Sequence, residues 1–150
     1  MTDTSAYSKP VKVEEKFISF INESLYGYVE FDLEGYARFA NKSAEEITGY
    51  CLEDNMNFRD VIIDEDLERA MLDFELVMTE SNAGPREYRL RRKDEVIIDI
   101  EVNSLPIKKQ NEIIGFQSTV LDISDRKKIE RDLVKSEMRY RSILETMEDE

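Results

Sequence analysis

Residues 115–127 read GFQSTVLDISDRK, an alternating apolar strand that runs without a break into the start of a charged helix. Successive side chains of a strand point to opposite faces, so this pattern predicts one buried and one exposed face. Because no linker separates the strand from the helix, a change in the sheet is passed on to the helix. No catalytic cluster elsewhere in the sequence competes with this junction, which therefore indicates signalling rather than chemistry.

The length and charge of the chain limit its class and its partners. A chain of 150 residues can form one domain with a hydrophobic core but not two complete ones. Its 34 acidic and 21 basic residues give a net charge of −13. This negative field repels nucleic acid and anionic lipid, so neither is expected as a partner. The short apolar runs predict no signal peptide and no membrane span.

Histidine is absent from the sequence, and Cys51 is the single cysteine. The lack of histidine removes the usual haem ligand, the usual zinc ligand, the Ser-His and Cys-His nucleophile pairs and a phospho-accepting histidine. We therefore expect no metal site. One cysteine cannot form an internal disulfide, so a cytoplasmic location is expected. Cys51 is interpreted as a bystander rather than a redox sensor.

Hydrophobic periodicity predicts an α+β fold in which two strands, then helices, then three strands follow one another along the chain. A helical stripe opens at Val13, and a long helix carries apolar residues from Leu67 to Met78. Asn41 and Ser43 are both N-cap types, and Ser43 with Glu46 fits a capping box that opens a short helix, which Gly49 ends. The predicted strands cover residues 28–33, 36–40, 86–92, 96–105 and 113–123. In the fourth strand, the side chains expected to face inward are those of Val96, Ile98, Ile100 and Val102.

A terminal helix is predicted from Asp125 onward, and its apolar residues recur at alternating gaps of four and three. This spacing is typical of a coiled-coil seam. The predicted dimer contacts are Ile129, Leu133, Tyr140, Ile143 and Met147. Residues 137–144 also resemble residues 14–21, which indicates the first helix of a second copy. The expected domains are a leader (1–12), a flanking helix (13–26), a core (27–124) and a linker helix entering the next repeat (125–150).

Three motifs resemble the PAS family, the Per-Arnt-Sim sensory fold, over residues 14–127. They are ANKSAEEITGY at 40–50, DEDLER at 64–69, and the exit DISDRK at 122–127, which is similar to the D-I-T-E-R-K exit of that family. Residues 136–147 resemble the opening of a following PAS repeat in a multi-domain sensor kinase. The resemblance implies a five-stranded antiparallel sheet with helices packed on one face, a pocket between them and dimerisation through flanking helices.

The chain departs from two cofactor-binding branches of this family. Light-oxygen-voltage domains place a flavin-adduct cysteine where this chain has Phe58, and a flavin-contacting glutamine where it has Val120. Haem-binding members use a histidine on the long helix, and this chain has none. The resemblance therefore implies no haem and no covalent flavin photochemistry. No cofactor is predicted, although a non-covalently held flavin stays open.

The inward-facing residues of the predicted strands and long helix could line a ligand cavity or could simply close the core. The pocket candidates are Phe31, Phe39, Met71, Phe74, Tyr88, Ile98, Ile100, Phe116, Ser118 and Val120. Tyr88 and Ser118 are the polar members. Because they are few, the expected ligand is small and apolar, or absent.

Four residues of the exit motif are assigned to signal transfer: Asp122, Ile123, Ser124 and Arg126. Asp122 and Arg126 are spaced to pair across the bend between strand and helix. The alternative is that Asp122 or Ser124 caps the helix by accepting a backbone N–H. A basic run over residues 86–93 could bind a phosphate or an acidic partner, but outward charges that keep a strand edge soluble are the commoner explanation.

These observations predict a non-catalytic sensory and dimerisation module that detects a small ligand or a partner and signals through its terminal helix. The expected partners are a second copy of the chain, a downstream PAS repeat and an output domain, a histidine kinase in a two-component pathway or alternatively a diguanylate cyclase. Two other functions stay open. One is a redox sensor with non-covalent flavin, and the other is a small carboxylate-based enzyme, although no convergent acid pair can be identified.

Overall fold

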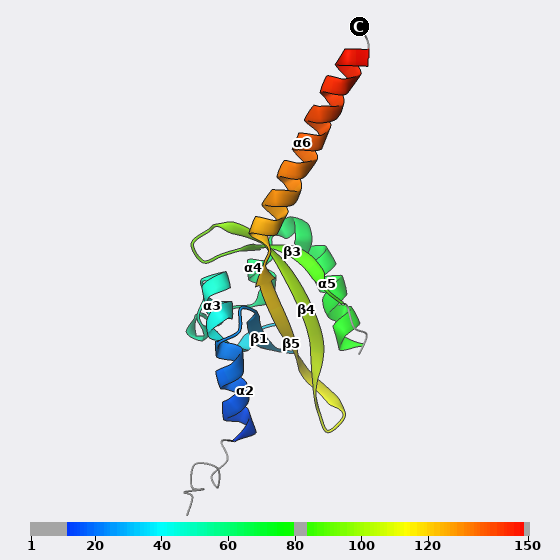
Figure 1. Ribbon diagram of the computed structural model, residues 1–150. Coiled ribbons are helices and arrows are strands. Elements are labelled where there is room, and N and C mark those ends of the chain that lie inside the picture. The colour runs from blue at the N-terminus through cyan, green and yellow to red at the C-terminus, as the bar shows by residue number, and fades with distance from the viewer. Residues whose placement is uncertain (1–11, 80–83, 149–150) are drawn as a thin grey trace, which may run out of the picture.

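The computed structural model describes residues 12–79 and 84–148 (Figure 1). The predicted leader therefore lies outside the described residues except for Lys12, as do the last two residues of the linker helix. The elements in chain order are α2 (Val13–Asn22), β1 (Gly27–Asp32), β2 (Ala37–Ala40), α3 (Lys42–Thr48), the 3-10 helix η1 (Leu52–Asp54), α4 (Phe58–Val61), α5 (Asp64–Met78), β3 (Arg86–Arg91), β4 (Ile97–Lys109), β5 (Glu112–Asp122) and α6 (Ser124–Glu148).

The strands form a five-stranded antiparallel sheet in the order β2-β1-β5-β4-β3. The chain crosses from one edge of the sheet to the other between β2 and β3, and α3, α4 and α5 lie in this crossover. Strand β5 lies at the centre and pairs with β1 on one side and with β4 on the other. The predicted fold class, an α+β sheet with helices on one face, is confirmed.

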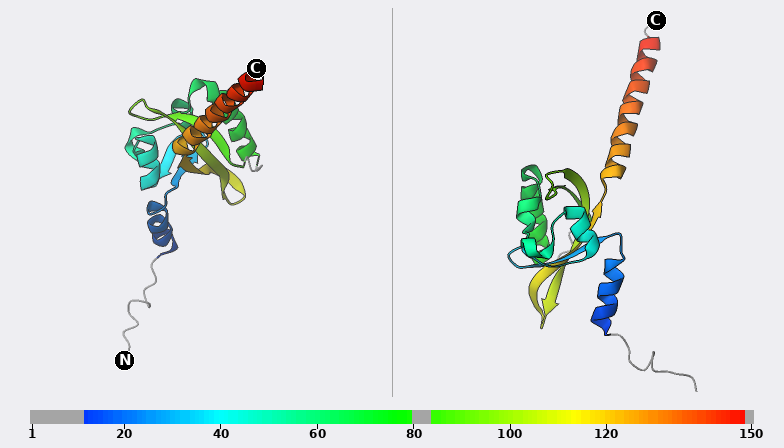
Figure 2. Two further views of the ribbon diagram at one scale, coloured as in Figure 1. Left: turned by 45° about the horizontal axis from the view of Figure 1, so that its top comes forward. Right: turned by 90° about the vertical axis from the view of Figure 1, so that its left-hand side faces the viewer.

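Helices cover the two faces of the sheet unequally. Figure 2 shows α3 and α5 on one face, and α2 on the side away from them. The ring of Phe17 on α2 contacts Tyr28 of β1 edge-on at 5.4 Å, which places α2 against the outer face. Helices α2 and α6 extend from the body in opposite directions (Figure 1). None of the helices in the described part of the chain is both long enough and apolar enough to cross a bilayer.

The core lies between the inner face of the sheet and the helices α3, α4 and α5, and consists of two clusters of buried residues. The first cluster contains Val61, Ile62, Ala70, Tyr88, Leu90, Ile98, Ile100 and Val120. The second contains Val29, Phe31, Ala37, Ala44, Val77 and Phe116. The apolar stripe predicted for α5 faces this core, since Ala70 and Val77 are buried and Leu67, Phe74 and Met78 pack against the clusters.

The start of α3 uses one of the two predicted N-cap residues and not the other. Asn41, rather than Ser43, is the N-cap, because its side-chain Oδ1 accepts a hydrogen bond from the Ala44 N–H at 2.9 Å. The Ser43 hydroxyl instead donates to the carbonyl of Ser24. Gly49 ends the helix as predicted, with a φ of 77° that glycine adopts without strain.

The hairpin between β4 and β5 is longer than predicted, and β4 begins later. Both strands continue to a turn at Gln110 and Asn111, which have φ values of 52° and 66°. Two successive positive φ values are typical of a two-residue hairpin turn that matches the twist of the strands. Val96 was predicted to face inward, but it is 53% exposed and lies between the turn at residues 93–95 and β4. The inward placement of Ile98 and Ile100 is confirmed.

Candidate functional site

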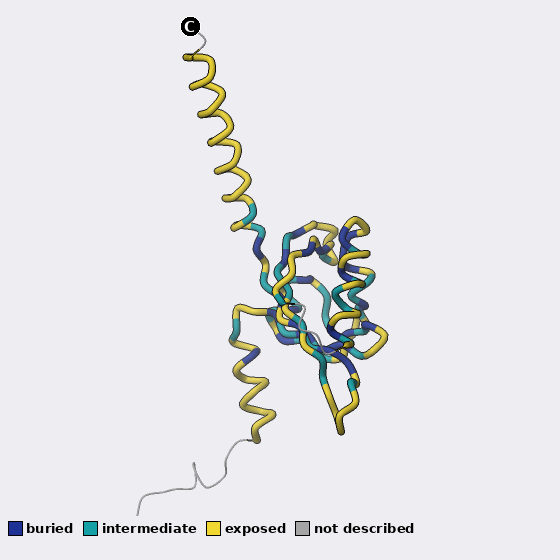
Figure 3. Tube along the Cα trace, turned by 90° about the vertical axis from the view of Figure 1, so that its right-hand side faces the viewer, coloured by how far each residue is buried: buried dark blue, intermediate teal, exposed yellow. Residues whose placement is uncertain are grey.

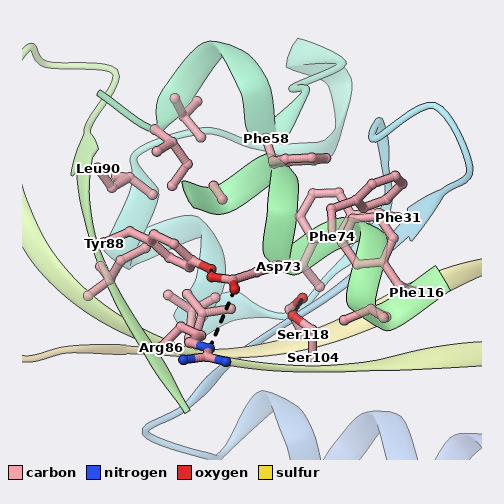
Figure 4. A pocket seen from close by; sticks show the side chains of 18 of the residues that line it. Phe31, Phe58, Asp73, Phe74, Arg86, Tyr88, Leu90, Ser104, Phe116 and Ser118 are labelled. Carbon is pink, nitrogen blue, oxygen red and sulfur yellow. Dashed lines mark hydrogen bonds and ion pairs between the residues drawn. The ribbon is translucent and has the colours of Figure 1, made fainter. Parts of the chain in front are cut away.

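A cavity of about 90 Å³ lies between helix α5 and the inner face of the sheet (Figure 4). Strands β1, β3, β4 and β5 supply one wall, and α4 and α5 supply the other. The lining residues are Val29, Phe31, Thr48, Met56, Phe58, Val61, Ile62, Ala70, Asp73, Phe74, Val77, Gly84, Arg86, Tyr88, Leu90, Ile100, Val102, Ser104, Phe116, Ser118 and Val120. The cavity is therefore enclosed mainly by apolar side chains.

Seven of the ten pocket candidates line this cavity: Phe31, Phe74, Tyr88, Ile100, Phe116, Ser118 and Val120. Ile98 and Met71 lie outside the lining. Ile98 is buried two residues from the cavity wall, in the core cluster next to Leu90. Met71 is partly buried on α5, about one turn before Phe74, but it is not part of the cavity lining.

Phe39 is a wrong assignment, because its ring lies on the outer face of the sheet. A β-bulge between Glu30 and Phe31 shifts the register of the β1–β2 pair, so that Phe39 pairs with outward-facing Glu30. The Phe39 ring contacts Tyr28 at 6.0 Å on the same face. Because a bulge reverses the in–out alternation of a strand beyond it, alternation along residues 36–40 does not give the face on which Phe39 lies.

Aromatic rings form one end of the cavity (Figure 4). Phe31 and Phe116 are stacked with their centroids 4.6 Å apart, and Phe74 contacts Phe116 edge-on at 5.1 Å. Phe58 on α4 contacts Phe31, Phe74 and Phe116. This end of the cavity can surround a flat or ring-shaped apolar group.

Two serine hydroxyls meet beside the aromatic end. The Oγ atoms of Ser104 on β4 and Ser118 on β5 are 2.7 Å apart and share a hydrogen bond, in the register that pairs the two residues. Ser104 was not among the candidates. Its inward direction follows from the same alternation that places Ile100 and Val102, so the sequence does carry a signal for it.

A polar group of three residues lies at the other end. The Tyr88 hydroxyl donates a hydrogen bond to the carboxylate of Asp73 on α5, and Arg86 pairs with the same carboxylate at 3.5 Å (Figure 4). Burial, together with this hydrogen bond, raises the pKa of Tyr88, so its phenol stays protonated. Arg86 is the exposed residue of the lining. Neither Asp73 nor Arg86 was among the pocket candidates, because charged residues on helices and strands are solvated by default, and Arg86 was named only as part of the basic run.

The junction that opens α6 is joined to β4 by its backbone. The Ile123 N–H donates to the Asp99 carbonyl at 2.9 Å, and the Asp99 N–H donates to the Ser124 hydroxyl at 3.2 Å. Ile123 itself is buried, with 3% of its surface exposed. Asp122 accepts a hydrogen bond from the Ser124 N–H at 2.9 Å, which confirms the alternative that it caps the helix start.

Ion pairs join the first two turns of α6 to the outer faces of β3 and β4. Arg126 pairs with Glu87 at 2.9 Å and with Glu101 at 3.4 Å, so its expected pairing with Asp122 is wrong. Lys127 pairs with Glu87 at 2.6 Å. Hydrogen bonding to the Lys127 ammonium holds the pKa of Glu87 below its usual value. One turn further, Arg131 pairs with Asp99 at 3.1 Å.

The family model for the PAS fold matches residues 37–120, more than half of the chain. The chain belongs to the PAS family. No curated protein sequence matches it significantly. Solved structures show the same fold. The PAS domain of a Colwellia psychrerythraea protein has a TM-score of 0.69 and 22% identity, and the match covers 76% of this chain and 99% of that one.

Two further solved structures come from proteins whose names state an output. A sensory box histidine kinase/response regulator of Burkholderia thailandensis matches with a TM-score of 0.64 and 17% identity, over 87% of this chain and 99% of that chain. The N-terminal domain of a diguanylate cyclase with a PAS/PAC sensor, from Marinobacter aquaeolei, matches with a TM-score of 0.59 and 12% identity, over 68% and 98%. At such identities these PAS domains share the fold alone with this chain.

The remaining candidate groups of this PAS domain have structural partners. In the basic run, Arg89 pairs with the buried carboxylate of Asp66 at 2.8 Å, and Lys93 pairs with Asp54 at 2.9 Å. Hydrogen bonds to neighbouring carboxylates, with Glu53 the largest contributor, raise the pKa of the Cys51 thiol and disfavour the reactive thiolate. Among residues 12–79 and 84–148, no three His, Cys, Asp or Glu side chains are grouped so as to hold a metal ion.

Proposed function

We propose that this PAS domain is a non-catalytic sensory module that detects a small ligand in the cavity and transmits its occupancy to an output domain through α6. One observation carries the proposal. The two strands that hold the start of α6, β3 and β4, also supply walls of the cavity.

Neighbouring residues of each strand connect the two faces of the sheet. On β3, Tyr88 lines the cavity and Glu87 holds Arg126 and Lys127 on the outer face. On β4, Ile100 lines the cavity and Glu101 contacts Arg126. A ligand that displaces the inner side chains can shift the backbone that carries the outer ones. It can then favour one orientation of α6 over another, which is a shift of populations rather than a chemical step.

The output that we propose is a histidine kinase in a two-component pathway, preceded by a second PAS repeat. Because the chain has no histidine, the phospho-acceptor would lie in that kinase domain. A PAS domain from a sensory box histidine kinase supports this choice, and one from a diguanylate cyclase supports the alternative output. A cavity of about 90 Å³ favours a ligand smaller than a flavin, because cofactor-sized sites measure about 300–1,000 Å³.

Replacing Glu87 with alanine tests the transmission. In a fusion of residues 1–150 to a histidine kinase core, we expect Glu87→Ala to change the autophosphorylation rate at least about fivefold, the size of a typical coupling energy. The reason is that Glu87 holds both Arg126 and Lys127. The matched control is Glu112→Ala, an exposed glutamate at the start of β5, which should leave the rate unchanged. Equal rates in the two variants would contradict the proposed route.

Dimerisation through α6 is a second part of the proposal. The seam residues Leu133 and Ile143 are 59% and 52% exposed, and such a row of exposed apolar side chains on a lone helix favours pairing with a second copy. Because burying one such side chain contributes roughly 1.5–3 kcal/mol, Leu133→Asp with Ile143→Asp should raise the dimer dissociation constant at least about tenfold. Sedimentation equilibrium measures this change.

The control for the seam replaces two apolar residues that are equally exposed but lie off the 4-3 row. Val134 and Met138 are 53% and 66% exposed, and Val134→Asp with Met138→Asp adds the same charge to the same helix. This pair should leave the dissociation constant within about threefold of that of the unchanged chain. If the control dissociates the dimer as strongly as the seam variant does, the contact does not follow the seam.

A further inference from the structure

The charges of the cavity lining indicate what kind of ligand it accepts. Its charged side chains are those of Asp73 and Arg86, and they pair with each other at the exposed end. Asp73 also accepts the Tyr88 hydroxyl. A charged ligand would therefore find its counter-charge already engaged, and burying an unpaired charge costs several kcal/mol. The lining favours an uncharged molecule.

The hydroxyl protons of the lining indicate where the ligand's polar atom lies. Thr48 donates to the carbonyl of Ala44 at 2.8 Å, and Tyr88 donates to Asp73. Ser104 and Ser118 together carry two hydroxyl protons, and their mutual hydrogen bond uses one of them. Among the described residues the second proton meets no acceptor. The serine pair is thus a donor that points into an apolar cavity.

We propose that the cavity binds a small uncharged molecule with a ring-shaped apolar body and one acceptor oxygen, such as a carbonyl, which accepts a hydrogen bond from the Ser104–Ser118 pair. The ring lies against Phe31, Phe74 and Phe116. The volume of about 90 Å³ is smaller than the about 150 Å³ of an apolar cavity that holds benzene, so a six-membered ring enters only when the side chains of the lining move outward. This assignment rests on the proposed function, because it takes the cavity as the sensory site.

Four compounds that share a six-membered carbon ring serve as probes of the full chain. They are cyclohexanone, methylenecyclohexane (its hydrocarbon isostere), cyclohexylammonium and cyclohexanecarboxylate. Binding is followed by isothermal titration calorimetry and by chemical shifts of the cavity methyl groups. We expect cyclohexanone to bind at least about tenfold more tightly than either charged probe, because the charged probes must lose their hydration without gaining a counter-charge.

The serine pair is tested with Ser104→Ala combined with Ser118→Ala. This variant should weaken cyclohexanone binding about fivefold, the value of one ordinary hydrogen bond, and change methylenecyclohexane binding less than about twofold. The control Thr119→Ala removes a hydroxyl from the outward-facing neighbour of Ser118 and should alter neither affinity. If the double variant does not fold, Ser104→Ala alone replaces it, because Ser104 is the less buried of the two serines. This single variant should likewise weaken the binding of cyclohexanone more than that of methylenecyclohexane.

Three results would overturn the assignment. The first is that cyclohexanecarboxylate binds more tightly than cyclohexanone and that Arg86→Ala abolishes this tighter binding. The second is that the serine variant loses equal affinity for cyclohexanone and for methylenecyclohexane. The third is that neither neutral probe binds. The proposed function is judged separately by the kinase fusion. If cyclohexanone binds through the serines but leaves the fusion's rate unchanged, the ligand class stands and the sensory role fails. If no neutral probe binds while Glu87→Ala still changes the rate, the proposed transmission through α6 stands and the ligand class fails.

Discussion

Replacing Gly115 with alanine should destabilise the fold by about 3 kcal/mol or more, at the upper end of the cost of overpacking a core. A Cβ atom at this position would lie 2.2 Å from the carbonyl oxygen of Phe31 and 3.4 Å from the Cα of Asp32. Both neighbours are backbone of β1, so neither can move without breaking the pairing of β1 with β5. Urea denaturation followed by circular dichroism measures the loss.

Gly84→Ala provides the matched control for this substitution. No atom of the described residues lies within 4 Å of the Cβ that it would add, so the expected cost comes from its φ of 66°. A left-handed backbone costs a residue with a Cβ about 1–2 kcal/mol. A loss in Gly115→Ala no greater than in Gly84→Ala would mean that β1 does not approach β5 as closely as the structure has it.

Asn41→Ala should lower the free energy of unfolding by about 3 kcal/mol, because a buried hydrogen-bonding centre would be left without its partners. Asn41 is fully buried, and its side chain makes four hydrogen bonds to the backbone. Its Oδ1 accepts from the N–H groups of Tyr28 and Ala44, and its Nδ2 donates to the carbonyls of Ile21 and Tyr26. The substitution should also release α2, which amide hydrogen exchange can follow.

Asn22→Ala isolates the contribution of burial. Asn22 is exposed, and its Oδ1 accepts from the Lys42 N–H at 3.2 Å, so it bonds the backbone at the start of the same helix α3. Its loss should cost less than about 1 kcal/mol, because water replaces the lost contact. Comparable losses in the two variants would argue against Asn41 as the centre that joins α2, β1 and α3.

The strands and the long helix could be predicted because each follows one short period. Alternation placed Ile100, Phe116 and Ser118 on the inner face, and the helical stripe placed Phe74 opposite them. The misassignment of Phe39 has a local cause, the β-bulge that reverses the alternation of β2. The periodicity of residues 36–40 does not indicate this bulge.

The polar end of the site and the anchoring of α6 could not be predicted for a different reason. Asp73 and Arg86 carry charges that single-residue preferences place in solvent, yet each points to the other across the cavity edge. Arg126 bonds Glu87, 39 residues earlier in the chain, rather than its sequence neighbour Asp122. Such pairings depend on which strands lie next to each other, and this becomes known only when the sheet order is known.

Helix α6 runs as one uninterrupted rod from Ser124 to Glu148, exposed along nearly its whole length (Figure 3). A rigid rod of 25 residues extends about 37 Å at 1.5 Å per residue. The length of α6 therefore sets both a distance and a rotation, since each added residue moves the far end by about 1.5 Å and turns it by about 100°. The number of residues in α6 therefore sets the orientation, relative to the sheet, of any group attached at the far end of the helix. An insertion of one residue in the exposed part of α6 would rotate that group without changing any contact of the core.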